Sequence, residues 1–397
     1  MFEGSASNSC RDFGAPVLAV CGFSGSGKTT LLEAAIPHLI AAGLSIAVIK
    51  HDAHGFSVDQ EGKDSDRFFR AGATVVLRGP SEQFERRGGA VSLSLETTLA
   101  DLAHDHDLVL VEGHKDTHLP KVWLTNERNS SAPKEVTEIW KTLPWGSDRL
   151  HKFLRFIKSW LPSAWDSRPL FAGLLVGRNS SSMRAPKELF KSQYQILAEI
   201  TATALTSVLP GDSSESRALA DARIAILGAG PVPSALENVT RLANVPSLLE
   251  PLAGLLAAHR WHPRAAWIVA VCDYSWPSHP ELEMLVNHRK PGTWAVMLRQ
   301  PNGHPSPGLA LLEPQALEVL ERALLVRGPE NVGIAELSEN PHTLILPHAT
   351  QLLFDPNTST ECNFGSRHRK KNQADAKRAR KKISEQGIAV SACEGAL

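Results

Sequence analysis

The sequence has few cysteines, and their spacing does not form a metal site. No two of the five cysteines make a C-x-x-C pair, because they stand at Cys10, Cys21, Cys272, Cys362 and Cys393. This scatter argues against a zinc or iron–sulfur centre built from cysteines and favours a reducing compartment.

The sequence also lacks a net charge and a long apolar run. The 42 Lys and Arg residues balance the 42 Asp and Glu residues, which argues against a dedicated nucleic-acid-binding protein. No apolar run approaches the about 20 residues that a membrane span needs. Residues 1–13 are polar and carry acids, unlike a secretory signal. We therefore expect a cytoplasmic protein without a membrane segment.

Positive charge is concentrated near the C-terminus, where residues 367–382 are densely basic. We expect residues 363–397 to form a disordered, solvated tail. The alternative is an arm that binds an anionic partner, such as a phosphate-rich cofactor, an acidic client surface or nucleic acid.

The most informative motif is the sequence G-F-S-G-S-G-K-T at residues 22–29, which fits the phosphate-binding pattern G-x-x-x-x-G-K-[ST]. The apolar segment 16–21 predicts a buried strand before it, and residues 30–35 predict the start of a helix after it. In such a loop the backbone N–H groups turn toward phosphate, and the helix N-terminus adds its positive dipole end. The residues that we expect at the nucleotide are Gly22, Ser24, Gly25, Ser26, Gly27, Lys28, Thr29 and Thr30.

The motif predicts that the chain binds a nucleoside triphosphate. Lys28 would contact the β- and γ-phosphates, and the Thr29 hydroxyl would bind Mg²⁺. The alternative, a glycine-rich turn without a nucleotide, is less favoured because strand, loop and helix are all in place.

Strands and helices alternate after the loop, which predicts a parallel sheet of the P-loop NTPase type in an α/β fold. The predicted elements are strand 44–50, helix 64–71, strand 73–77, helix 96–103 and strand 108–111. Ligands of such sheets bind outside the carboxyl ends of the strands.

Three polar clusters follow this first strand–loop–helix unit, and two of them come directly after a predicted strand. They supply further candidate nucleotide-binding residues, namely His51, His54, Asp59, Asp64, Arg67, Glu112 and Gly113. A carboxylate at the position of Glu112 can hold Mg²⁺ or its water, so we expect Thr29 and Glu112 to share the metal. A solvated histidine pair and a solvated acid–base loop remain the alternatives for the first two clusters.

In this order the motifs resemble those of the MobB family, the GTP-binding proteins of molybdopterin guanine dinucleotide biosynthesis. The motifs are G-x-x-x-x-G-K-T, K-H-x-x-H-x-F, D-x-x-G-K-D-S-x-R, A-G-A, L-V-E-G-x-K and L-P-K. The resemblance covers about residues 14–125 and implies GTP with Mg²⁺, weak GTPase activity and a role in attaching GMP to the molybdenum cofactor. The residues alone leave the base undetermined.

Residues 135–161 predict an amphipathic helix, with Trp140, Trp145 and Trp160 as packing anchors rather than ligand contacts. We place the first domain at 14–165, with a helical linker from about residue 134.

A second α/β pattern starts at residue 170, with predicted strands at 170–176, 224–227 and 267–272. The loop after the first strand ends at Lys187, and Asp273 follows the third. Together with P-L-A-G at 251–254 and N-T-S-T-E at 357–361, these features resemble the MobA family of molybdenum cofactor guanylyltransferases. The resemblance implies a Rossmann-like nucleotidyltransferase domain, which we place at 168–362.

The resemblance to MobA also implies that Lys187 and Asp273 are catalytic, with Lys187 on the phosphates and Asp273 binding Mg²⁺. The substrates would be GTP and molybdopterin. Several residues depart from the family pattern, namely Arg178, Ser182, Arg184, Asn244 and Glu250. An arginine in place of a loop glycine restricts the backbone, and a glutamate adds negative charge near the triphosphate.

Two functions therefore remain open for the whole chain. One is transfer of GMP from GTP to Mo-molybdopterin, and the other is a non-enzymatic GTP-binding adapter that assists a separate guanylyltransferase. A P-loop kinase or a GTP-driven metallochaperone is a third alternative, against which the second and third motifs count. Expected partners are other cofactor-biosynthesis proteins or client molybdoenzymes, and a homodimer is left open.

Overall fold

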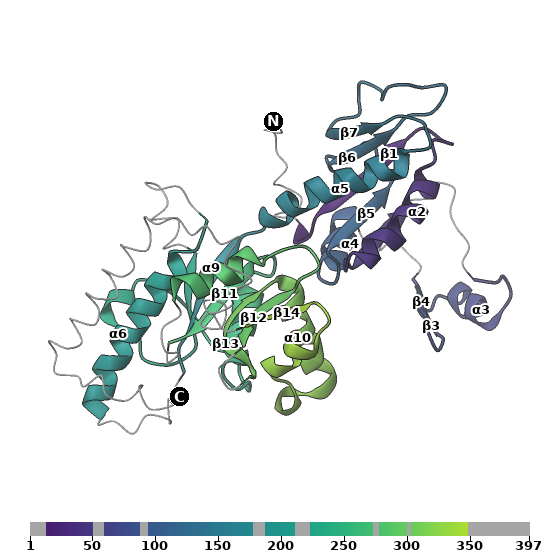
Figure 1. The fold of residues 1–397 in the computed structure, drawn as a ribbon. Helices are drawn as coiled ribbons and strands as arrows, with labels where there is room; N and C mark the ends of the chain where they lie inside the picture. Colours follow the sequence, from purple (N-terminus) through teal and green to yellow (C-terminus); the bar gives the residue numbers. More distant parts are fainter. Residues whose placement is uncertain are drawn as a thin grey trace, which may run out of the picture. The chain divides into compact units, whose positions relative to one another are not determined.

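The computed structural model describes residues 13–50, 59–87, 94–177, 187–210, 223–272, 278–299 and 303–347 (Figure 1). Met1–Leu346 belong to one compact unit, which holds two separate large sheets. Several predicted features lie outside the described residues, namely His51, His54, Arg178, Ser182, Arg184, Asp273, the segment 357–361 and the tail. The predicted domain limits at 14–165 and 168–362 stay predictions.

The first sheet has five strands in the order β2-β5-β1-β6-β7, and all of its neighbouring pairs are parallel. Its strands are β1 Val17–Gly22, β2 Ile46–Lys50, β5 Leu108–Glu112, β6 Lys121–Leu124 and β7 Ile139–Leu143. The apolar runs of β1 and β5 are buried along nearly their whole length, as expected of strands with helices on both faces. The predicted α/β fold with a parallel sheet is confirmed for this part of the chain.

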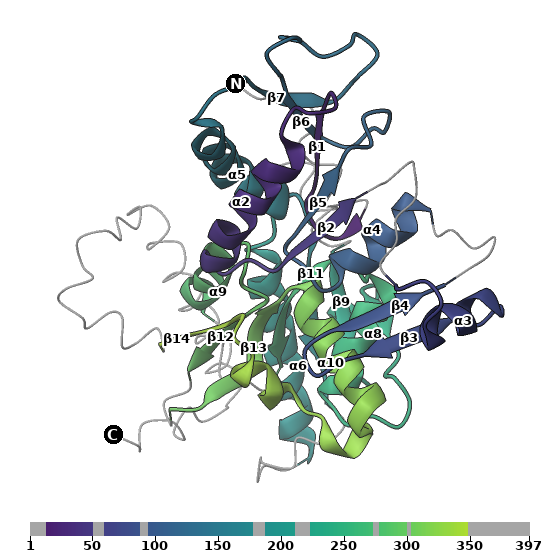
Figure 2. The same cartoon turned by 90° about the vertical axis from the view of Figure 1, so that its right-hand side faces the viewer.

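Three helices cover the first sheet, α2 Lys28–Ala41, α4 Leu95–Ala103 and α5 Arg149–Asp166. Because side chains alternate along a strand, Leu18 and Val20 of β1 pack with α2 and α5 on one face, whereas Val17 and Ala19 pack with α4 on the other. Figures 1 and 2 show α2 and α5 together on their face.

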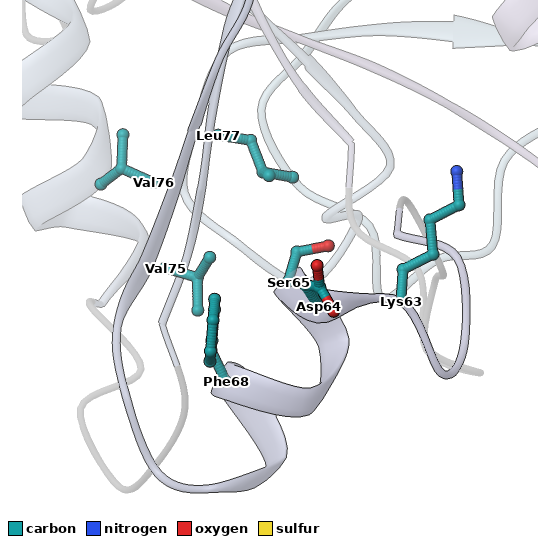
Figure 3. Close-up of a pocket in the computed structure, with 7 residues that line it drawn as sticks. All are labelled: Lys63, Asp64, Ser65, Phe68, Val75, Val76 and Leu77. Atoms are coloured by element: carbon teal, nitrogen blue, oxygen red, sulfur yellow. The ribbon is translucent and has the colours of Figure 1, made fainter.

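The structure corrects two predictions in this part. Residues 135–161 are not one helix, since β7 occupies Ile139–Leu143 and the helix α5 begins only at Arg149. The strand predicted at 73–77 exists as β3 Val75–Arg78, but it does not join the parallel sheet. It pairs antiparallel with β4 Gln83–Arg86, next to the helix α3 Asp64–Arg70, and Figure 3 shows Phe68 and Val75 facing each other there.

The second sheet has seven strands in the order β10-β9-β8-β11-β13-β12-β14. The strand β13 is antiparallel to both of its neighbours, and the other pairs are parallel. Its strands are β8 Leu170–Leu175, β9 Ile224–Leu227, β10 Thr240–Leu242, β11 Ala266–Val271, β12 Ala295–Arg299, β13 Pro305–Leu312 and β14 Thr343–Leu346. The predicted strands at 170–176, 224–227 and 267–272 are all present.

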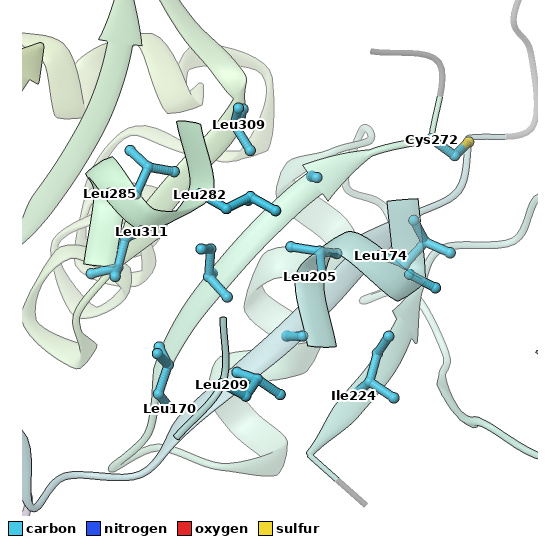
Figure 4. Close-up of a cluster of buried hydrophobic side chains, with 14 of the residues drawn as sticks. Leu170, Leu174, Leu205, Leu209, Ile224, Cys272, Leu282, Leu285, Leu309 and Leu311 are labelled. Atoms are coloured by element: carbon cyan, nitrogen blue, oxygen red, sulfur yellow. The ribbon is translucent and has the colours of Figure 1, made fainter. Parts of the chain in front are cut away.

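Helices cover both faces of the second sheet. The regular helices are α6 Lys187–Thr206, α8 Leu252–Trp261, α9 His279–Asn287 and α10 Pro314–Arg327, and short 3₁₀ segments lie at Ser234–Leu236, Pro329–Asn331 and Ile334–Glu339. The helices α6 and α9 pack on the face that presents Leu170 and Leu174 (Figure 4). The helices α8 and α10 pack on the opposite face, against Phe171 and Leu175.

A buried ion cluster lies where the chain passes from α5 into β8. The Glu313 carboxylate accepts hydrogen bonds from Arg168 at 2.5 Å and from Arg289 at 2.6 Å, and Arg168 also donates to the Gly14 carbonyl just before β1. Burial alone would raise the pKa of Glu313, but Arg289 and Arg168 hold it below its usual value. In addition, the Trp294 indole donates to Asp107 at 2.9 Å. The hydrogen bonds from Arg168 to Gly14 and from Trp294 to Asp107 connect residues of the two sheets.

Candidate functional site

The loop between β1 and α2 has the backbone that a phosphate cradle requires. Gly25 and Gly27 have φ angles of 72° and 81°, in the left-handed region that favours glycine. A Cβ atom at Gly22 would lie 2.5 Å from the Ser26 hydroxyl oxygen and 2.6 Å from the Leu124 carbonyl oxygen, so no other residue fits there. Gly27 is also the N-cap of α2, which directs that helix's N-terminal N–H groups at the loop.

Lys28 and Thr29 lie where the motif predicts a phosphate contact and a metal ligand. The Lys28 ammonium donates to the carbonyl oxygens of Gly22 at 3.2 Å and Phe23 at 3.1 Å, which keeps it over the loop. The Thr29 hydroxyl donates to the Glu112 carboxylate at 2.8 Å.

Glu112 reaches the loop because β5 lies directly beside β1, with Glu112 opposite Val20. The two oxygens at Thr29 and Glu112 are the hard ligands that Mg²⁺ prefers, so these residues fit the metal that the motif implies. The sequence therefore predicted a pair that the fold does bring together.

Gly113 follows Glu112 and closes the end of β5. Its N–H donates to the Val20 carbonyl at 3.0 Å, and its carbonyl accepts from the Cys21 thiol at 2.9 Å. Burial raises the pKa of Cys21 to about 11, so this thiol is an inert packing group and no nucleophile.

Comparison with known proteins agrees with this geometry. Residues 17–141 match the family described as molybdopterin guanine dinucleotide synthesis protein B. A molybdopterin-guanine dinucleotide biosynthesis adapter protein of Haemophilus influenzae is 41% identical over 126 residues, which cover 31% of this chain and 70% of that protein. The Escherichia coli adapter protein is 34% identical over 125 residues, which cover 30% of this chain and 71% of that protein.

The chain belongs to the MobB family. The resemblance that the motifs indicated for residues 14–125 is thus confirmed. A crystal structure of a MobB homologue from Bacillus stearothermophilus aligns with 36% of this chain and 97% of its own, at 21% identity and a TM-score of 0.29.

Arg149 is a residue of the loop's surroundings that the motifs did not predict, and it lies beyond the MobB match at the first position of α5. Its guanidinium donates to four carbonyl oxygens, namely those of Ser26 at 2.6 Å, Thr125 at 2.7 Å, Pro144 at 3.1 Å and Leu143 at 3.4 Å. Burial lowers the pKa of Arg149. No sequence signal marked it, because the helix predicted at 135–161 puts residue 149 in its interior, whereas in the structure Arg149 is the first residue of α5.

The third MobB motif, D-x-x-G-K-D-S-x-R, belongs to a small unit made of α3, β3 and β4. Asp59 accepts from the Ser65 hydroxyl at 2.8 Å and from Arg86 at 3.2 Å, while Asp64 and Arg67 pair with each other at 3.5 Å and are exposed. A shallow pocket of about 430 Å³ lies between α3 and β3 (Figure 3). Its lining residues are Lys63, Asp64, Ser65, Phe68, Val75, Val76 and Leu77. A nucleotide role for Asp59, Asp64 and Arg67 stays a prediction.

Asp66 organises this unit, although the sequence analysis gave it no role. Its carboxylate accepts from the Gly62 N–H at 2.9 Å, Arg70 at 2.8 Å and Arg86 at 2.9 Å. The hydrogen bond from the Gly62 N–H has the largest effect on the pKa of Asp66. Together with the hydrogen bonds from Arg86 and Arg70, it lowers that pKa to about 2.

In the second sheet, a carboxylate lies at the carboxyl ends of β8 and β9. Glu250 accepts from the Ala229 N–H at 3.3 Å and from the Asn244 amide at 2.9 Å. Its oxygens lie 3.2 Å from where a Cβ of Gly177 would be and 3.4 Å from that of Gly228. Lys187 begins α6, and its side chain lies outside the described residues, as does Asp273.

Within the described ranges, no helix is long and apolar enough to cross a membrane. The same residues contain no group of three or more His, Cys, Asp or Glu side chains placed to hold a metal ion.

Proposed function

We propose that the protein binds GTP with Mg²⁺ at the loop between β1 and α2 and acts as an adapter in molybdopterin guanine dinucleotide biosynthesis. The observation that carries this proposal is the placement of Lys28, Thr29 and Glu112 around a glycine cradle inside the MobB match. The relatives in this family are named as adapter proteins of that biosynthesis.

Each group at the loop has a defined chemical part in this proposal. The N–H groups of the loop and of the α2 N-terminus would bind phosphate oxygens, and Lys28 would neutralise the β- and γ-phosphates. Thr29 and Glu112 would hold Mg²⁺, which offsets the remaining phosphate charge. Arg149 would keep the loop rigid through its bond to the Ser26 carbonyl.

Calorimetric titration of the full chain with GTP and Mg²⁺ tests the proposal. Lys28→Ala removes a charged hydrogen-bond donor, so we expect GTP binding to weaken about 10- to 100-fold. Lys152→Ala is the matched control, because Lys152 is a surface lysine of α5 paired with Asp148 at 2.8 Å. A wild-type chain that does not bind GTP, or equal losses in the two variants, would contradict it.

GMP transfer by the second sheet is a second candidate function, and the strand order supports it. Numbered within this sheet, the strands run 3-2-1-4-6-5-7, so the order reverses between β8 and β11. Ligands of such open sheets bind at this switch point, outside the carboxyl ends of the strands. The segments that carry Lys187 and Asp273 follow β8 and β11, on either side of it. This topology supports a MobA-like, nucleotidyltransferase-type domain.

The Glu250 carboxylate beside Gly177 and Gly228 favours the adapter over the transferase, because it would repel a triphosphate at that edge. Release of pyrophosphate from GTP, measured with and without Mo-molybdopterin, separates the two functions. A transferase would release pyrophosphate only with molybdopterin, and Asp273→Ala would abolish it. An adapter would release none while still binding GTP through Lys28.

A further inference from the structure

A half-exposed tryptophan lies beside the phosphate loop. Trp145 follows β7 and keeps 50% of its surface exposed, whereas Trp160 and Trp123 are 7% and 1% exposed. The expectation that tryptophans of this segment are packing anchors is therefore met by Trp160 but not by Trp145. An exposed indole presents an aromatic face that a planar ligand can cover, and burying an aromatic ring is strongly favourable.

The position of Trp145 is fixed by contacts with the loop and its support. Its N–H donates to the Thr125 hydroxyl at 3.1 Å, at the end of β6. The Arg149 guanidinium lies 5.1 Å from the centre of the indole ring. A Cβ atom on Gly27 would be 3.8 Å from the indole, so the ring borders the residue that precedes Lys28.

The sheet order places the indole on the side of the loop away from the metal ligands. Glu112 belongs to β5 on one side of β1, while β6 and β7 lie on the other side. The carboxyl ends of these parallel strands lie at the same edge of the sheet as the loop. A triphosphate held by Lys28, with its metal at Thr29 and Glu112, can direct its nucleoside end toward the β6–β7 side, where Trp145 is exposed.

We propose that Trp145 is the stacking platform for the base of the bound nucleotide, an inference that rests on the proposed GTP site. The Trp145 backbone is fixed by its hydrogen bond to Thr125 and the ring lies against Arg149, so the residue loses little freedom on binding, which favours stacking. Stacking uses the π-face that all bases share, so Trp145 would supply affinity for a nucleoside but would not choose between guanine and adenine.

The test compares GTP with inorganic tripolyphosphate, both titrated calorimetrically into the full chain with Mg²⁺. Tripolyphosphate has the phosphates but no base, so it reports the loop alone. We expect Trp145→Ala to weaken GTP binding about tenfold or more and to leave tripolyphosphate binding unchanged. Trp145→Phe keeps an aromatic face and should retain most of the GTP affinity.

The matched control is Trp261→Ala, because Trp261 is 41% exposed and lies in α8, a helix that packs on the second sheet. It should change neither titration. Equal weakening of GTP and tripolyphosphate by Trp145→Ala would show that the indole only supports the loop, and an unchanged GTP affinity would likewise overturn the inference. If the wild-type chain binds neither ligand, the proposed GTP site itself fails, which is a distinct result.

Discussion

The carboxyl edges of the two sheets are built alike and charged differently. After β1, glycines with positive φ angles and the N-terminus of α2 present backbone N–H groups at the loop, and Lys28 adds a positive charge there. After β8 and β9, glycines also open the backbone, but the Glu250 carboxylate takes the Ala229 N–H. The same position at a sheet edge therefore carries a positive side chain in one sheet and a negative one in the other.

The ion cluster gives the largest expected effect and tests whether the two sheets are independent. Glu313→Ala would remove the buried carboxylate that both Arg168 and Arg289 contact, so we expect a loss of about 3–5 kcal/mol in the free energy of unfolding. Urea denaturation measures it, with the exposed Glu330→Ala as the control. A loss confined to the second sheet, with GTP binding and the first sheet untouched, would show that the sheets unfold separately.

Glu250→Gln tests the charge difference between the two sheet edges, and its expected effect is smaller than that of Glu313→Ala. The amide still accepts from the Ala229 N–H but carries no charge, so phosphate binding at the second sheet should strengthen about three- to fivefold. The titration is made with GTP in the Lys28→Ala background, so that the weakened first site contributes less to the measured binding. The exposed Glu237→Gln serves as the control, and an equal affinity in both would contradict the role given to Glu250.

The smallest expected effect is a pH dependence confined to the unit of α3, β3 and β4. Because folding lowers the pKa of Asp66 from 3.8 to about 2, its stabilising contribution is complete above about pH 4 and is lost as the pH falls toward 2. Hydrogen-exchange protection of residues 62–86, measured over this range, should decrease while β1 and β5 keep theirs. Asp66→Asn should remove the pH dependence, and a dependence that survives this change would assign it to another group.

Local patterns allowed the phosphate site to be predicted from the sequence. The strand before Gly22 and the helix after Lys28 were correct because the apolar run and the loop motif define both ends. The pairing of Thr29 with Glu112 followed from the rule that parallel strands end at one edge.

Tertiary contacts explain what could not be predicted. The apolar residues of the segment 135–161 fit both the helical and the strand periodicity. Ile139–Leu143 becomes a strand because it pairs with β6. The residues Val75–Arg78 have the right composition for the parallel sheet, but they pair instead with Gln83–Arg86 close by in sequence. Arg149 and Trp145 lie beside the loop because of contacts with residues far away in the chain, Ser26 and Gly27.

The contacts of the Arg149 guanidinium determine how long a segment must be to keep the phosphate loop intact when it is expressed alone. A segment cut at residue 141 would contain every residue of the MobB match, yet the Ser26 and Thr125 carbonyls would have lost their shared donor. The smallest segment that keeps the loop and its supporting contacts therefore includes α5 and ends no earlier than Asp166.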